Sequence, residues 1–454
     1  MLQTVLNSFR VPDLRRRLII TVLLLAACRV GVFIPIPGVD LGAVAALFRK
    51  VQEQAGVALM SFVDIFSGGG LSQCAVFGLG VMPYISASII FQLLVQVIPA
   101  LKKLSEEGEA GRQKINQYTR YATVLLCLFQ AGMILSGFRA SDPAIFSGFG
   151  AGMMFLGALL MTAGTLFLMW VGEQIDEYGI GNGVSLIIMA NILSRFPIAV
   201  RHVAVSFRFT MSPASEDEIG ILTLAFLIAS FIAVIVGIVM ITQGQRRIPF
   251  QQAKQMRGRR IYGGLKHYLP LQVNAANVIP IIFAQSLLIF PTGAANVLAS
   301  QTEPGTFLNA VGRGLQRALT MGSFTYNVTY IALIFFFCYF WTAITFNPTD
   351  MAKNLKEHGS FIPGIRPGKR TAEYLERVMT RITLPGAASL SLIAIFPSLL
   401  GSIIGVKDFR VMQFFGGTTI LIAVGVALDL VKKIESQLLM RHYEGFTRGR
   451  KRRF

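Results

Sequence analysis

Long apolar runs separated by short polar stretches recur along the whole chain. Because a helix needs about 20 mostly apolar residues to cross a bilayer, we predict ten transmembrane helices. Their predicted bounds are Leu18–Ile34, Val76–Ile98, Tyr121–Phe138, Met153–Val171, Val184–Val205, Ile219–Thr242, Leu271–Phe290, Tyr326–Phe346, Ile382–Ile404 and Phe414–Leu430. The fifth run is the weakest, since Arg195, Pro197 and Arg201 interrupt it. The pattern predicts an all-α polytopic membrane protein.

Composition agrees with this prediction. The chain has 454 residues, of which 53% are hydrophobic and 14% charged, whereas soluble domains carry about 25% charged residues. An ordinary soluble enzyme is therefore excluded. Three arginines at 15–17 and an apolar run up to Cys28 imitate a lipoprotein signal peptide, but the apolar run continues to Ile34, so we expect a transmembrane helix there instead.

The positive charges lie mainly on one side of the predicted helices. Of the 42 Lys and Arg residues, 31 fall in the two tails and in the loops on the same side of the predicted membrane as the N-terminus. Seven of them lie in 243–270, seven in 347–381 and eight after residue 430. Cytoplasmic loops carry this excess, so we expect both termini in the cytoplasm. The segment 172–183 does not fit, since it holds Glu173, Asp176 and Glu177 and no positive residue.

Groups that would perform chemistry are scarce. The sequence has no phosphate-binding loop, no H-E-x-x-H and no G-x-S-x-G, and its four cysteines and four histidines form no metal-binding pattern. Only Arg29 lies clearly inside a predicted span. Buried ionisable groups mark proton and ion routes, so we disfavour an intramembrane enzyme and an ion-coupled transporter of small solutes. We expect no cofactor and no metal.

A short apolar stretch, Ser61–Leu71, precedes the second predicted span and ends in Gly68–Gly70. Its length is insufficient to cross a membrane. It is predicted either as a re-entrant half-helix followed by a glycine hinge, or as a helix on the outer membrane surface.

The second and seventh predicted spans contain similar segments, Gly80–Pro83 and Asn277–Pro280. Each proline is expected to kink its helix. The similarity indicates either a simple packing kink used twice or an inverted repeat of five spans, which would place a transport path between the repeats.

The two large cytoplasmic loops carry more charge than orientation requires. Residues 245–262 are predicted to form two short strands around a polar tip, and residues 360–370 a loop punctuated by Pro and Gly. The charges either anchor the loops to lipid headgroups or bind a large acidic partner such as ribosomal RNA or an acidic protein face.

Eight segments, in order along nearly the whole chain, together resemble the SecY family, which forms the channel of the bacterial Sec protein translocon. They are Phe33–Asp40, Met60–Ser72, Gly80–Ile90, Asp176–Ser185, Gly244–Ile248, Val278–Pro280, Phe361–Gly368 and Phe415–Thr418. The resemblance implies ten helices in two pseudo-symmetric five-helix halves. The corresponding segments are 1–205 for the first half, 206–270 for the sixth span with its basic loop, 271–430 for the remaining spans, and 431–454 for a basic tail.

The resemblance also implies roles for particular residues. A ring of bulky aliphatic side chains would close the pore: Val81, Ile85, Val184, Ile188, Ile192, Ile282 and Ile422. A plug would fill the outer cavity: Phe62, Val63, Asp64, Ile65, Phe66, Ser67, Gly68, Gly69, Gly70 and Leu71. A lateral gate between the second and seventh spans would include Pro83, Gln92, Pro280 and Gln285. Its two glutamines would weaken gate packing or make ordinary interhelical hydrogen bonds.

The implied activity is that of a protein-conducting channel in the bacterial cytoplasmic (inner) membrane. It would pass unfolded polypeptides across the bilayer and release membrane segments and signal sequences into it. Energy would come from the SecA ATPase or a translating ribosome, bound at Arg246, Arg247, Arg259, Arg260 and Arg366. SecE and SecG would be its partner subunits.

Overall fold

The computed structural model describes residues 11–53, 63–141, 151–209, 220–252, 255–257, 260–262, 266–301, 306–320, 323–404 and 417–451. These residues are mostly helical and form two compact units. The first contains the described residues up to Ser206 together with those from Val426 onward, and the second contains those from Phe207 to Gly425.

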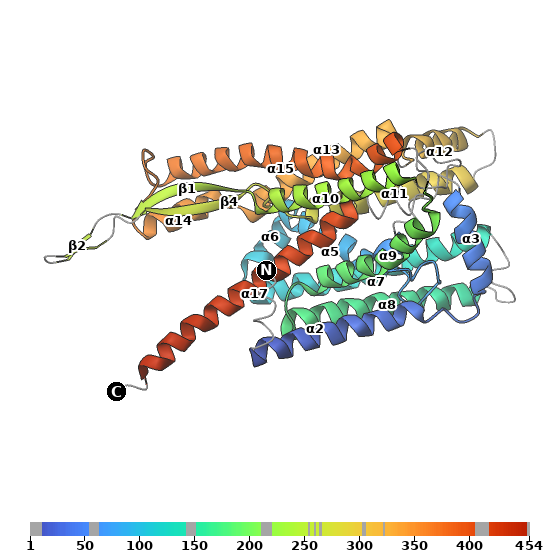
Figure 1. Ribbon diagram of the computed structural model, residues 1–454, viewed down its shortest axis with the longest axis horizontal. Coiled ribbons are helices and arrows are strands. Elements are labelled where there is room, and N and C mark those ends of the chain that lie inside the picture. The colour runs from blue at the N-terminus through green and yellow to red at the C-terminus, as the bar shows by residue number, and fades with distance from the viewer. Residues whose placement is uncertain are drawn as a thin grey trace. The chain divides into compact units, whose positions relative to one another are not determined.

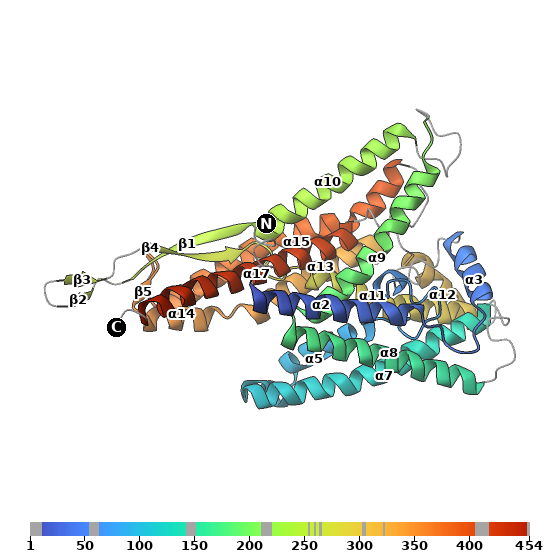
Figure 2. The same cartoon turned by 60° about the horizontal axis from the view of Figure 1, so that its bottom comes forward.

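The first unit is a bundle of helices (Figures 1 and 2). Its helices are α2 (Pro12–Val30), the 3-10 helix η1 (Gly31–Phe33), α3 (Leu41–Glu53), α5 (Met82–Val97), α6 (Pro99–Glu106), α7 (Glu109–Ser141), α8 (Ala151–Tyr178), α9 (Gly183–Ser206) and most of α17 (Gly417–Lys451). Helices α7 and α8 run side by side in both views. Helix α9 is continuous in spite of Arg195 and Pro197, so the weakest predicted span forms a full helix.

The second unit combines helices with a small sheet. Its elements are α10 (Ile221–Gln243), β1 (Gln245–Gln252), β2 (Gln255–Arg257), β3 (Arg260–Tyr262), β4 (Lys266–Gln272), α11 (Ile279–Gln301), α12 (Phe307–Ala318), α13 (Phe324–Thr345), α14 (Pro348–Glu357), β5 (Ser360–Phe361) and α15 (Lys369–Ile404). Strands β1 and β4 form a long antiparallel hairpin (Figure 1) with the β2–β3 pair beyond it. Strand β5 pairs with β1, so both basic loops contribute to one three-stranded sheet.

Six helices of the described residues are long and apolar enough to cross a membrane. A seventh candidate is α5 with α6, which are bent by 99° at Ile98. The protein is therefore a multi-span membrane protein, whereas the full count of ten spans stays a prediction.

Two spans begin later than predicted, for the same reason. Helix α5 begins at Met82 instead of Val76, and α11 begins at Ile279 instead of Leu271. The preceding residues form turns, and in the second case also the end of β4. Pro83 and Pro280 are each the second residue of their helix, where no intrahelical hydrogen bond is lost. The predicted kinks at these prolines are therefore wrong.

The starts of α5 and α11 share a backbone arrangement. Gly80 and Asn277 have positive φ angles of 59° and 54°, and the N–H of each donates to the carbonyl three residues earlier. Four residues before Gly80, the carbonyl of Val76 lies against Gly164 of α8. Four residues before Asn277, the carbonyl of Val273 lies in the same way against Gly386 of α15. The sequence similarity therefore reflects a repeated local structure.

The acidic segment 172–183 owes its composition to local contacts. Glu173 of α8 accepts two hydrogen bonds at 2.7 Å from Arg120 of α7, and Asp176 accepts one at 2.8 Å from the N–H of Gly183. One acid thus pairs with a cation of a neighbouring helix, and the other fixes the turn that leads into α9. These contacts explain why the segment departs from the charge pattern.

Candidate functional site

Residues 63–81 fold against α2 and α9 in the first unit. Among the described residues, 63–66 are helical and 67–81 are mostly turns, so the helix ends at Phe66 and does not continue to Leu71 as predicted. Further along, the N–H of Ile36 donates to the carbonyl of Cys74 at 3.0 Å, and that of Val76 to the carbonyl of Ile34 at 2.9 Å. These bonds join the segment that follows α2 to the one that leads into α5.

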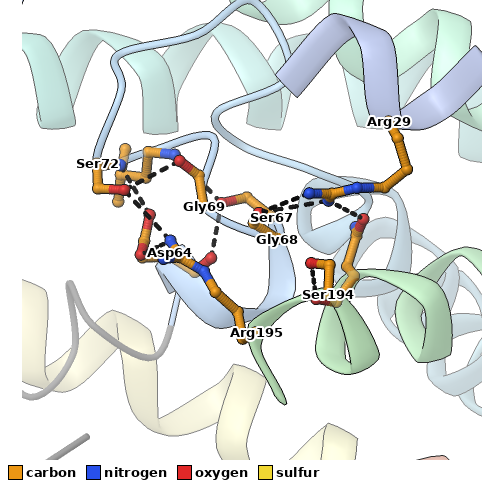
Figure 3. Close-up of polar contacts among 10 residues, drawn as sticks. Arg29, Asp64, Ser67, Gly68, Gly69, Ser72, Ser194 and Arg195 are labelled. Atoms are coloured by element: carbon orange, nitrogen blue, oxygen red, sulfur yellow. Dashed lines mark hydrogen bonds and ion pairs between the residues drawn. The ribbon is translucent and has the colours of Figure 1, made fainter. Parts of the chain in front are cut away.

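An ion pair joins the start of this segment to α9. The guanidinium of Arg195 pairs with the carboxylate of Asp64 and also donates to the Oγ of Ser72 at 3.2 Å (Figure 3). The N–H of Ser72 donates to the other carboxylate oxygen of Asp64 at 2.7 Å. The two charged side chains are only 23% and 12% exposed. Pairing offsets the cost of burying these charges.

A second group of side chains holds the main chain of the same segment. Arg29 of α2 donates to the carbonyl of Gly68 at 3.3 Å and to Asn191 Oδ1 at 3.3 Å. Asn191 of α9 donates to the carbonyl of Phe66 at 2.9 Å. Figure 3 shows Arg29 and Arg195 reaching this segment from two different helices. Residues 64–72 are thus bound to α2 and α9 by side chains far away in sequence.

The glycines at 68 and 69 are required by this geometry. Their φ angles are +66° and +99°, values that favour glycine. A Cβ at Gly68 would lie 2.3 Å from Arg29 Nη1, and one at Gly69 would lie 2.5 Å from Arg195 Nη2. The sequence prediction of a hinge here is not tested, but the structure gives these glycines a second purpose, which is to let two arginines approach the main chain.

The predicted plug residues from Val63 to Leu71 are buried except for Ile65, which is half-buried; Phe62 lies outside the described residues. Of the predicted pore ring, Val81, Ile85, Ile188, Ile192 and Ile422 are buried, and Val184 and Ile282 are half-buried. Five of the seven lie in the first unit and two, Ile282 and Ile422, in the second.

Helix α9 connects the predicted ring with the predicted plug. Residues spaced by three or four share a helix side, so Asn191 and Arg195 lie on the same side as Ile188 and Ile192. One side of α9 therefore carries both the aliphatic ring residues and the polar groups that bind residues 64–72.

The predicted gate residues differ in their surroundings. Pro83 and Pro280 are buried at the starts of α5 and α11. Gln92 is exposed and donates to Ser88 Oγ within its own helix at 3.3 Å, whereas Gln285 is only 6% exposed. The gate residues belong to different units, α5 to the first and α11 to the second.

The predicted docking arginines that the structure describes with side chains are all exposed: Arg246, Arg247 and Arg366. Arg259 lies outside the described residues, and for Arg260 only its place in β3 is described. The sheet beneath them has its own apolar core, in which Ile248, Leu271 and Ile362 pack with α15. This core fixes the two basic loops to the N-terminal part of α15 and makes them one surface, which we call the basic platform.

Sequence reasoning missed Arg195, Asn191 and Ser72. In the sequence Arg195 only interrupts the weakest predicted span, although an ionisable residue inside a span is itself a signal of function. Arg29 stands out in the sequence as a charge inside a predicted span, but the sequence does not indicate its partner. Asp64 was included in the plug on the family resemblance alone, without a physical role.

Fold and site define a helical, multi-span membrane protein with a buried polar cluster and a basic platform. A sequence model of the SecY family matches residues 75–431. Two curated relatives are both named protein translocase subunit SecY. The one from Thermotoga maritima is 41% identical to this chain over 98% of each chain. The one from Escherichia coli is 40% identical over 95% of this chain and 93% of its own length. The chain belongs to the SecY family, and the predicted protein-conducting channel subunit is confirmed.

Solved structures agree on the fold. One described as "The structure of a protein conducting channel" covers 93% of this chain and 92% of its own, with a TM-score of 0.60 and 17% identity. Sec61 in a canine ribosome-channel complex covers the same shares, with a TM-score of 0.57 and 16% identity. At these identities the likeness establishes the fold.

Proposed function

We propose that this chain is the channel-forming subunit of a Sec translocon in the bacterial cytoplasmic membrane, with both termini in the cytoplasm. It passes unfolded secretory polypeptides across the membrane and releases membrane segments laterally into the membrane. The observation that carries the proposal is family membership over nearly the full length of the chain. The charge distribution supports the orientation.

Residues 63–71 act as the plug of the idle channel, and the aliphatic ring closes around a passing chain. A narrow apolar collar resists ion flow by dewetting, yet adapts to any polypeptide. The proposal is supported by the burial of residues 63–71 and by the position of Ile188 and Ile192 on the side of α9 that binds the segment. It is also supported by Ile85 and Ile282, which stand five residues after Gly80 and Asn277 in the repeated arrangement.

The basic platform binds the SecA ATPase or a translating ribosome, and SecE and SecG complete the membrane complex. Arg246, Arg247 and Arg366 are exposed on a surface that has its own apolar core beneath it. They support a docking role, because a patch of one charge sign steers an acidic partner. One of the similar folds is that of Sec61 in a ribosome-channel complex, which favours the ribosome as one of the partners.

The function is tested by reconstituting the protein with SecE, SecG and SecA in vesicles. An added preprotein is expected to become protected from protease only when ATP is present. Failure of protection with correctly folded, correctly oriented complex would contradict the proposal.

The plug and the ring are tested by ion flux through the same vesicles without substrate. Deleting residues 63–71 is expected to raise the leak. The substitutions Ile85→Asn and Ile282→Asn are expected to raise it by similar, smaller factors, because each hydrates one position of the collar while the plug stays in place. A deletion that leaks no more than the wild-type protein would remove the plug assignment.

A further inference from the structure

We propose that the Asp64–Arg195 ion pair is the latch of the idle channel, which means the contact that holds residues 64–72 in place. When this pair separates, residues 64–72 leave as one preformed body from their seat, the surface of α2 and α9 that carries Arg29, Asn191 and Arg195. The inference deepens the proposed function and rests on it, since it assumes that residues 63–71 are the plug. In this proposal Arg195 is a positioning residue, which acts through Asp64 and contacts no translocating chain in the closed state.

The internal bonds of the segment support movement as one body. Asp64 accepts from the N–H of Ser72 through its carboxylate at 2.7 Å and from the N–H of Gly69 through its carbonyl at 2.8 Å. Ser67 Oγ donates to the carbonyl of Asp64 at 3.1 Å and accepts from the N–H of Leu71 at 3.2 Å. These bonds close a compact loop between its two ends. None of them involves α2 or α9, so they persist when the segment leaves those helices.

The bonds to the neighbouring helices are of two kinds. Arg29 and Asn191 bind main-chain carbonyls, which every sequence provides. Arg195 binds the side chains of Asp64 and Ser72. Of these contacts, only the one at residue 64 joins two ionised side chains of opposite charge, whereas the acceptors of the segment that Arg29 and Asn191 bind are neutral main-chain carbonyls. The specificity of the hold therefore lies in the Asp64–Arg195 pair.

The surroundings make this pair a two-state device. Replacing a buried ion pair by apolar residues costs little stability, but breaking one leaves an uncompensated charge. A partly separated pair is therefore unfavourable, and the segment is either seated or fully displaced into water. Arg29 is a second cation on the same seat, so a seat without Asp64 holds two positive side chains and is further disfavoured.

The test uses the complete complex with its partner subunits in vesicles without substrate, and measures ion leak. We expect Asp64→Asn and Arg195→Gln each to raise the leak by about tenfold or more, because each removes a charged hydrogen bond. In the double variant the leak is expected to rise by less than the product of the two single-variant fold-increases. The charge swap, Asp64→Arg combined with Arg195→Asp, is expected to lower the leak again in part. Arg195→Lys, which keeps the charge, is expected to be intermediate.

The matched control is Arg201→Gln, which removes an exposed arginine from the same helix and is expected to leave the leak unchanged. A second readout reports the position of the segment. Val63, next to Asp64, is buried, so a cysteine introduced there by Val63→Cys is expected to react slowly with a membrane-impermeant thiol reagent. When Val63→Cys is combined with Asp64→Asn, the reaction rate is expected to rise in parallel with the leak. A unit that has merely unfolded would instead show a lowered midpoint of thermal unfolding.

The outcomes separate the two levels of the proposal. A leak that rises on deletion of residues 63–71 but not in Asp64→Asn or Arg195→Gln overturns the latch and leaves the plug assignment in place. Single-variant factors that simply multiply in the double variant also overturn the latch, because they show no coupling between the two residues. A deletion without leak removes the plug assignment, and the latch with it.

Discussion

The residues around Gly80 and those around Asn277 have the same local backbone but different surroundings. In the first unit the turn follows the segment bound by Arg29, Asn191 and Arg195. In the second unit the turn follows β4, which belongs to the basic platform. The repeated turn thus sets where a helix starts, while the residues before it form the polar-bound segment in the first unit and part of the basic platform in the second. The predictions below separate these two contributions.

The largest effect is expected from Ile248→Ala, which removes a side chain that is 2% exposed in the core of the basic platform. A large-to-small change of this kind costs about 2–5 kcal/mol. We expect weaker binding of SecA in a sedimentation assay and no change in the ion leak of the idle channel. A raised leak would show that the platform and the seal are not independent.

The next effect is expected at the two glycines that contact the repeated carbonyls. A Cβ at Gly164 would lie 2.2 Å from the oxygen of Val76, and one at Gly386 would lie 2.5 Å from that of Val273. Gly164→Ala and Gly386→Ala are each expected to destabilise the protein by about 1–3 kcal/mol, the usual cost of overpacking. The midpoint of thermal unfolding in detergent measures the change.

The controls for these glycines are Gly132→Ala and Gly237→Ala, which have open space around the added Cβ. They are expected to leave the midpoint unchanged or to raise it slightly. If Gly164→Ala lowered the midpoint and Gly386→Ala did not, the two contacts would not be equivalent and the repeat would be limited to the turn itself.

A smaller effect is expected at the turns. Gly80→Ala places a Cβ on a residue with a φ angle of +59°, at a cost of about 1–2 kcal/mol. That Cβ would lie 3.2 Å from the Cα of Ser67, so the ion leak is expected to rise as well. Asn277→Gly keeps the positive φ angle and is expected to change the unfolding midpoint little. Equal losses in both variants would contradict this reasoning.

The smallest effect is expected from the exposed arginines of the platform. Arg246→Gln and Arg366→Gln are each expected to weaken SecA or ribosome binding by no more than a few-fold, because exposed charges are screened by salt. The loss is expected to shrink as the salt concentration rises. A loss that does not depend on salt would indicate a packing role for these side chains instead of a charge role.

Much of this architecture could be predicted from the sequence. The apolar runs located the membrane helices, and eight segments in order identified the family. The sequence did not predict where α5 and α11 begin, because this depends on the positive φ angles at Gly80 and Asn277. A proline near such a turn starts a helix instead of kinking it.

The polar cluster was also beyond sequence reasoning. Asp64 and Arg195 are separated by 131 positions in the chain, and nothing in either neighbourhood indicates the other. Without its partner, Arg195 only weakened a predicted span, and Gly68 only suggested flexibility.

The sequence by itself determined that the chain is a multi-span membrane protein, that its positive residues are unevenly distributed along the chain, and to which family it belongs. These properties follow from the transfer of local segments from water to lipid, which depends on composition over short windows. The tertiary structure decided which buried charges are paired and which carbonyls and glycines meet. Such contacts depend on distances in space between residues of different helices, and electrostatic and packing energies are set by those distances.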